Sequence, residues 1–135
     1  MEQQNIDFIR SHCHIMNLTD DEIKLTLRLM ELTKQFSWSD IYKKSPEVNV
    51  LSNEDKFLLL LGKMDREDNL VRSKMLIHYF GGSVYQWRKI GRKHPLTDVA
   101  TAFSESSSGY YGRGWVIAPH IHSLMKYLNT PIDKL

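Results

Sequence analysis

Five consecutive apolar residues, from Phe57 to Leu61, constrain the fold of this chain more than any other feature. They lie between Lys56 and Lys63, and the Ser52-Asn53-Glu54-Asp55 sequence before them is typical of a helix start, since acidic side chains suit the positive end of the helix dipole. A helix that is apolar nearly all round needs other elements to cover most of its surface. We therefore expect the helix that carries these residues to be the most buried one.

Several other segments carry helical patterns. Thr19 with Glu22 and Ser83 with Gln86 are capping-box pairs that mark two helix starts, and Gly81-Gly82 allows a sharp helix exit. The spacing of apolar residues predicts helices over residues 6–15, 20–36, 38–44, 70–80 and 84–93. At 135 residues and 41% hydrophobic, the chain suits one core and is too short for two comfortable domains. We expect a single compact, mainly α domain that spans the whole chain.

Charge is distributed unevenly, although the net charge is only +2. Residues 1–65 hold 8 Lys and Arg against 11 Asp and Glu, a net charge of −3, whereas residues 66–135 hold 10 against 5, a net charge of +5. A positive surface raises the local concentration of polyanions and releases counterions when it binds them. The basic half therefore favours a nucleic-acid partner, with a solvated helix face as the alternative explanation of so small a difference.

The predicted helix over residues 84–93 holds the densest basic cluster. Around Trp87 it carries four cationic side chains, Arg88, Lys89, Arg92 and Lys93. An aromatic residue among arginines and lysines is typical of an element that grips phosphates, so these four are candidate phosphate contacts. The alternative is an amphipathic hairpin that buries Trp87 and leaves the charges in water.

The segment from Pro95 to Leu128 is interpreted as a C-terminal helix-turn-helix at about residues 97–118. Thr97 or Asp98 can cap a first short helix. Ala100 is small, as the close crossing of two short helices requires. The serine-rich run that follows is typical of a turn. A plain helical hairpin has the same spacing and is the alternative.

The second of these helices is expected to face DNA. It would pack one of its two tyrosines into the core and turn the other outward with Ser107, Ser108 and Arg113, whose groups can contact phosphates and base edges. The candidate DNA contacts are therefore Ser107, Ser108, Tyr110, Tyr111 and Arg113. Pro119 removes a backbone donor and clashes with the preceding turn, so this reading helix should end or kink there. The segment Trp115-Val116-Ile117 is also compatible with an extended conformation.

Motifs for metal, cofactor or catalytic chemistry are absent from the sequence. The clusters His12-Cys13-His14 and His120-Ile121-His122 lack the spacing of zinc sites. The glycines of Gly112-Arg113-Gly114 lack the Lys-Ser/Thr of a phosphate loop. Cys13 cannot face its sequence neighbours on a helix, so no nucleophilic dyad follows. We expect a protein that is not an enzyme and that needs no metal and no cofactor.

Sequence features also favour the cytoplasm. The longest apolar run is too short to cross a membrane, so no membrane partner is expected. The first ten residues, MEQQNIDFIR, are acidic and mixed, unlike a secretory signal. The single cysteine, Cys13, excludes an internal disulfide and suits a reducing compartment.

Four segments stand in a recognisable order along the chain: Phe36 to Ile41, Asn53 to Met64, Leu76 to Gly82 and Val99 to Leu128. In that order they resemble segments of the phage antitermination protein Q family, of the phage 21 type. The most specific likeness is Gly109-Tyr110-Tyr111-Gly112-Arg113, which is similar to the Gly-Tyr-Ile-Gly-Lys string of the family's helix-turn-helix. The resemblance implies a DNA-contacting role for Ser107, Ser108, Tyr110 and Arg113.

The resemblance further implies a phage late-gene regulator in the host bacterial cytoplasm. Such a protein binds double-stranded DNA near a promoter, loads onto paused host RNA polymerase and suppresses termination. We expect a sequence-specific DNA-binding transcription regulator that acts as an antiterminator, with its oligomeric state open and a homodimer on DNA included. One alternative is a plain helix-turn-helix repressor or activator. The other is a non-nucleic-acid interaction protein, a host-inhibiting or toxin-neutralising factor that binds through its acidic half around Trp38.

Overall fold

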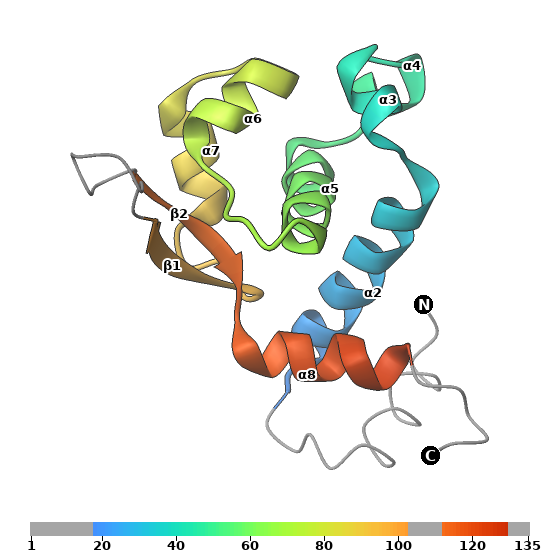
Figure 1. Ribbon diagram of the computed structural model, residues 1–135, viewed down its shortest axis with the longest axis vertical. Helices are drawn as coiled ribbons and strands as arrows, with labels where there is room; N and C mark the ends of the chain where they lie inside the picture. Colours follow the sequence, from blue (N-terminus) through green and yellow to red (C-terminus); the bar gives the residue numbers. More distant parts are fainter. Residues whose placement is uncertain (1–17, 103–111, 130–135) are drawn as a thin grey trace.

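The computed structural model describes residues 18–102 and 112–129. Its elements are α2 (Asp20–Gln35), α3 (Trp38–Tyr42), α4 (Pro46–Asn49), α5 (Asn53–Arg66), α6 (Ser73–Phe80), α7 (Val84–Gly91), β1 (Thr97–Ala102), β2 (Gly112–Ile117) and α8 (Pro119–Leu128). Helix α5 lies at the centre, with α2, α3 and α4 on one side and α6, α7 and the β1–β2 hairpin on the other (Figure 1). Helix α8 runs across one end. The predicted mainly α class is confirmed for the described residues.

Helix α5 is the most buried helix of the described chain, as its apolar sequence predicts. All residues from 57 to 64 are buried, and the side chains of Phe57, Leu59 and Leu60 have no exposed surface. The helix begins where its acidic start predicts, because the Ser52 hydroxyl accepts a hydrogen bond from the Asp55 N–H. The core of the molecule is therefore built around this one helix.

Helix α2 approaches α5 closely at a glycine. A Cβ atom placed on Gly62 would lie 2.1 Å from the Thr33 hydroxyl oxygen, nearer than any two such atoms can approach. That hydroxyl is fixed, because it donates a hydrogen bond to the Leu29 carbonyl at 2.6 Å. Beside it, the Lys63 ammonium donates to the Thr33 carbonyl at 2.9 Å, and burial holds the pKa of Lys63 below its usual value. Contact between the two helices thus depends on a missing side chain.

Predicted helix starts are confirmed where a cap marks them. Both predicted capping boxes are present, Thr19 with Glu22 before α2 and Ser83 with Gln86 before α7. The helix predicted from about residue 70 begins later, at Ser73, because the chain before it is extended. The helix predicted over residues 6–15 lies outside the described residues.

The predicted helix-turn-helix at residues 97–118 is wrong, because the described parts of this segment form the antiparallel strands β1 and β2. Thr97, Val99 and Thr101 are β-branched and alternate at the two-residue period of a strand, and this pattern prevails over the capping signal at the same place. Ala100 is paired with Gly114 across the hairpin, so its small side chain does not serve a helix crossing.

The chain around Pro119 also differs from the expectation. Residues 115–117 are extended, as one interpretation of the sequence allowed, and form the end of β2. Pro119 neither ends nor kinks a helix but occupies the first turn of α8, where its missing N–H costs nothing. Residues 103–111, between the two strands, lie outside the described residues, and with them Ser107, Ser108, Tyr110 and Tyr111.

A third extended segment joins the hairpin. The Val71 N–H donates to the Trp115 carbonyl at 2.9 Å, and the Trp115 N–H donates to the Val71 carbonyl at 2.8 Å. A Cβ atom on Gly114 would lie 2.3 Å from the Val71 carbonyl oxygen, so the glycine permits this approach. The link between α5 and α6 is thereby fixed to β2.

Replacing Gly62 with alanine should lower the free energy of unfolding by about 1–3 kcal/mol, because the added methyl group overpacks the α2–α5 contact. The double variant Gly62→Ala/Thr33→Ala removes the obstructing hydroxyl and should be more stable than the sum of the two single changes predicts. Urea unfolding of the four proteins measures this coupling, with the exposed Arg66→Ala on the same helix as a control. Additive single changes would contradict the proposed steric contact.

Candidate nucleic-acid interface

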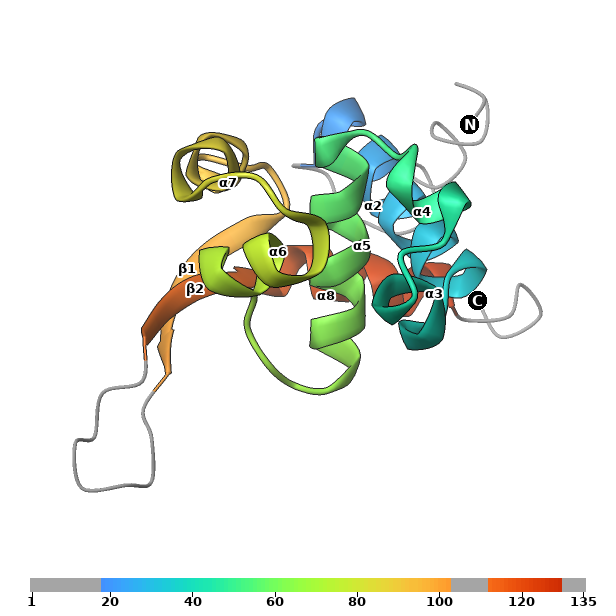
Figure 2. The same ribbon diagram turned by 90° about the horizontal axis from the view of Figure 1, so that it is seen from above.

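Helices α6 and α7 are joined by a tight turn of three residues. Gly81 and Gly82 have φ angles of 82° and 85°, a conformation that favours glycine, and Ser83 then caps α7. The indole N–H of Trp87 donates to the Gly81 carbonyl at 2.8 Å and holds the turn against α7. Figure 2 shows α6 from the side and α7 end-on, so the two helices cross. The result is a pair of crossed helices with a fixed geometry.

The inner face of α7 is fixed by two tryptophans. Trp87 is 2% exposed and belongs to the core. Gly91 lies directly against the Trp115 indole of β2, since a Cβ atom there would come within 2.3 Å of the ring. Trp115 in turn packs edge-on against Phe57 of α5, with ring centroids 5.5 Å apart. Helix α7 is therefore held at one distance from both the hairpin and the central helix.

The outer face of α7 is basic and exposed. The four predicted phosphate contacts, Arg88, Lys89, Arg92 and Lys93, are all exposed. With them lie two exposed hydrophobic side chains of the first turn, Val84 at 40% and Tyr85 at 74% exposure. The six side chains line one hollow of about 490 Å³. Cationic and apolar groups are thus mixed on a face that no described element covers.

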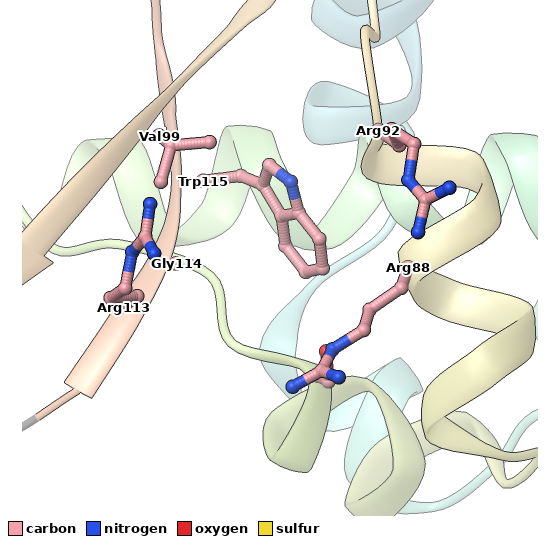
Figure 3. A pocket seen from close by; sticks show the side chains of 7 residues that line it. Arg88, Arg92, Val99, Arg113, Gly114 and Trp115 are labelled. Carbon is pink, nitrogen blue, oxygen red and sulfur yellow. The ribbon is translucent and has the colours of Figure 1, made fainter.

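A second hollow lies between α7 and β2. Its volume is about 470 Å³, and we call it the arginine cavity because three arginines stand around it; its lining residues are Ser73, Arg88, Arg92, Val99, Arg113, Gly114 and Trp115. In Figure 3, Arg88 and Arg92 project from α7 on one side, Arg113 lies on β2 on the other, and the Trp115 indole stands between them. Side chains predicted separately as phosphate and DNA contacts are thus brought together.

The electrostatic field of this surface is positive. From residue 69 to residue 97 the chain has six Lys and Arg and no Asp or Glu. Within the described part of the chain, Arg88, Arg92 and Arg113 take part in no ion pair. The nearest acidic residue in sequence, Asp98, lines a different hollow together with Asp65. An approaching anion meets several uncompensated cations here.

Sequence reasoning identified some of these residues and missed others. Arg113 was selected as a DNA contact on a helix, and the structure has it exposed on a strand. Val84 and Tyr85 were not selected. The signal that could have found them is their place on the helix surface, because they share the side of α7 that carries Arg88 and lies away from Trp87.

The histidines of α8 do not form a metal site with one another. His120 contacts Glu22 of α2 at 2.8 Å, and His122 contacts Asp65 of α5 at 2.6 Å. Over residues 18–102 and 112–129 no group of three His, Cys, Asp or Glu side chains is placed to hold a metal ion. Within the same ranges no helix is long and apolar enough to cross a membrane.

His94 connects α7 to β1 and is held neutral. Its Nδ1 accepts a hydrogen bond from the Leu96 N–H at 3.2 Å, and its ring packs on Phe57 with centroids 5.1 Å apart. Burial disfavours the charged imidazolium and lowers the pKa of His94 to about 4. This group is therefore part of the support of the basic surface and adds no charge to it at neutral pH.

Stability should fall as the pH drops from about 6.5 to about 4, because His94 takes up a proton in the unfolded chain before it does so in the folded protein. The lowered pKa corresponds to a total loss of about 3 kcal/mol. In urea unfolding measured over this range, His94→Asn keeps a hydrogen-bond acceptor but should lose this part of the pH dependence. The contribution of Glu22 and other groups cancels in the difference. Parallel curves for the two proteins would contradict the assignment.

No family model, no curated protein and no solved structure matches the chain. The geometry of the described residues is therefore the basis for the function proposed below.

Proposed function

We propose that the protein is a sequence-specific transcription regulator that binds double-stranded DNA by laying α7 in the major groove. The observation that carries this proposal is the exposed basic face of α7, on the second of two crossed helices. In helix-turn-helix proteins two helices joined by a turn of three or four residues, often with glycine, cross in this way, and the second reads the groove. The turn at residues 81–83 fits that description.

The size of α7 suits the B-DNA groove. The major groove is about 12 Å wide and accommodates an α-helix, whose diameter with side chains is about 10–12 Å, and the eight residues of α7 present about two turns to it. The deep and narrow major groove of an RNA duplex cannot admit a helix in this way. The β1–β2 hairpin follows α7 in sequence and lies beside it, an order known as a winged helix-turn-helix (Figure 1). Duplex DNA is therefore the nucleic acid we propose.

Residues of the first two turns of α7 supply the chemistry for reading bases. Lys89 can donate to the acceptor atoms of guanine in the major groove. Val84 and Tyr85 are exposed on the same face of α7 and can contact the methyl group of thymine. Arg92 and Lys93, farther along, suit backbone phosphates.

The proposal predicts that DNA selected from a random pool carries an enriched motif, and that Lys89→Ala weakens binding to it and relaxes the base preference at one position. Loss of one good base contact costs about 1–3 kcal/mol. Lys34→Ala removes one positive charge from α2, which lies on the other side of α5 from α7 (Figure 2), and is the matched control. Fluorescence anisotropy at several salt concentrations measures both. Equal losses in the two variants, or no enriched motif, would sink the proposal.

The resemblance to antitermination proteins extends this proposal to RNA polymerase. An antiterminator also needs a surface for a protein partner, and an aromatic cluster suited to one joins Trp38 and Tyr42 of the acidic half to Tyr79 of α6. Trp38 stacks on Tyr42 with centroids 5.5 Å apart, Tyr79 packs against both, and Tyr42 is 61% exposed. The same cluster favours the alternative of a protein-binding factor that does not engage DNA.

In vitro transcription through a terminator separates these activities. For an antiterminator, we expect readthrough to rise with added protein on a template that carries the selected motif, and Tyr42→Ala to reduce this effect while DNA binding persists. A template with a scrambled motif is the control. Motif-dependent repression or activation without readthrough would identify a plain regulator instead.

A further inference from the structure

Base reading by the outer face of α7 does not explain why a cavity lined by arginines lies between α7 and β2. We propose that it is a binding site for a phosphate ester, held by the guanidinium groups of Arg88, Arg92 and Arg113. If the ester is a backbone phosphate of bound DNA, this inference rests on the proposed function. If the ester is a small molecule free in solution, the inference does not depend on DNA binding.

Two elements are needed to build this site. Arg88 lies in the last turn of α7, and Arg92, four residues later, caps the end of the helix on the same side. Arg113 comes from β2, and in Figure 3 it lies across the Trp115 indole from Arg88 and Arg92, with which it lines the same hollow. Because Gly91 fixes the distance between α7 and Trp115, the opening between the arginines is set by the fold. The cavity is therefore a property of the packed domain and not of α7 alone.

The charges of the cavity select for an anion. Among the described residues its lining contains no carboxylate, and Arg88, Arg92 and Arg113 take part in no ion pair with other described residues. Three like charges around one space repel each other, and an anion between them reverses the sign of that interaction. The guanidinium fork matches phosphate oxygens in pairs, which a lysine ammonium cannot do. Arginine at all three positions thus favours phosphate.

The size and the walls of the cavity favour an ester over the bare ion. Its volume of about 470 Å³ lies within the range of small-molecule sites, about 300–1,000 Å³, and exceeds what one phosphate fills. Val99, 59% exposed on β1, and the Trp115 indole offer apolar surface for the attached organic group. Ser73, the first residue of α6, also lines the cavity and can offer its hydroxyl as a polar group.

Two sources can supply a phosphate ester: a nucleotide free in solution, or one backbone phosphate of a duplex that α7 has bound. Calorimetric titration with adenosine monophosphate, and with inorganic phosphate for comparison, tests the free source. A scan of single methylphosphonate substitutions along the selected DNA motif tests the backbone source, because each substitution removes one phosphate charge.

Arg113→Gln is the informative variant, since Arg113 is exposed on β2 and lies outside the reading face of α7. Losing a charge-assisted contact should weaken binding by about 10-fold or more, and Arg113→Lys, which lacks the fork, should restore only part of it. Lys34→Gln is the control, and urea unfolding verifies that each variant folds.

The outcomes separate the site from the proposed function. Nucleotide binding that Arg113→Gln abolishes supports the site with a free ligand, even if no DNA motif is ever selected. One methylphosphonate position that weakens the natural protein but leaves Arg113→Gln unaffected supports a backbone phosphate. If neither nucleotide binding nor the effect of any single methylphosphonate substitution depends on Arg113, the cavity is not a phosphate site. DNA binding by α7 is then judged only by the DNA selection and anisotropy measurements described above.

Discussion

The contact between Trp115 and Gly91 is the interaction on which the basic surface depends. The indole of β2 lies against a helix that offers no side chain at that point, and it also packs edge-on against Phe57 of the central helix. The backbone of Trp115 is meanwhile bonded to Val71, ahead of α6. One residue thereby sets the positions of α5, α6, α7 and the hairpin relative to each other. These positions determine where the arginines around Trp115 lie.

Local signals in the sequence were sufficient for much of the helical framework. Capping boxes act within four residues, so the starts of α2 and α7 could be predicted from Thr19 and Ser83 alone. The burial of α5 followed from apolar residues on all sides of one helix. These features need no knowledge of distant neighbours, which is why they could be predicted.

The hairpin could not be predicted in the same way. Thr97 and Asp98 are good helix caps, and the evidence for a strand was a short alternation whose pairing partner lies beyond residue 111. The pairing of Ala100 with Gly114 and the hydrogen bonds between Trp115 and Val71 join residues that are far apart in the sequence. Arg88 and Arg92 were found from local charge density, but their approach to Arg113 depends on the strand register. The family likeness rested partly on the segment read as a helix, and its implications stay predictions.

The short connection between β2 and α8 couples the position of the hairpin to that of α8. Only Ala118 separates the strand from Pro119, and its N–H is bonded to the Leu96 carbonyl at 2.9 Å. So short and so firmly held a joint leaves the hairpin and α8 little freedom to rotate separately. Two residues after Ala118, at the start of α8, His120 ties this helix to Glu22 of α2. A rotation of the hairpin caused by a bound polyanion would therefore be transmitted through α8 to α2, on the opposite side of α5.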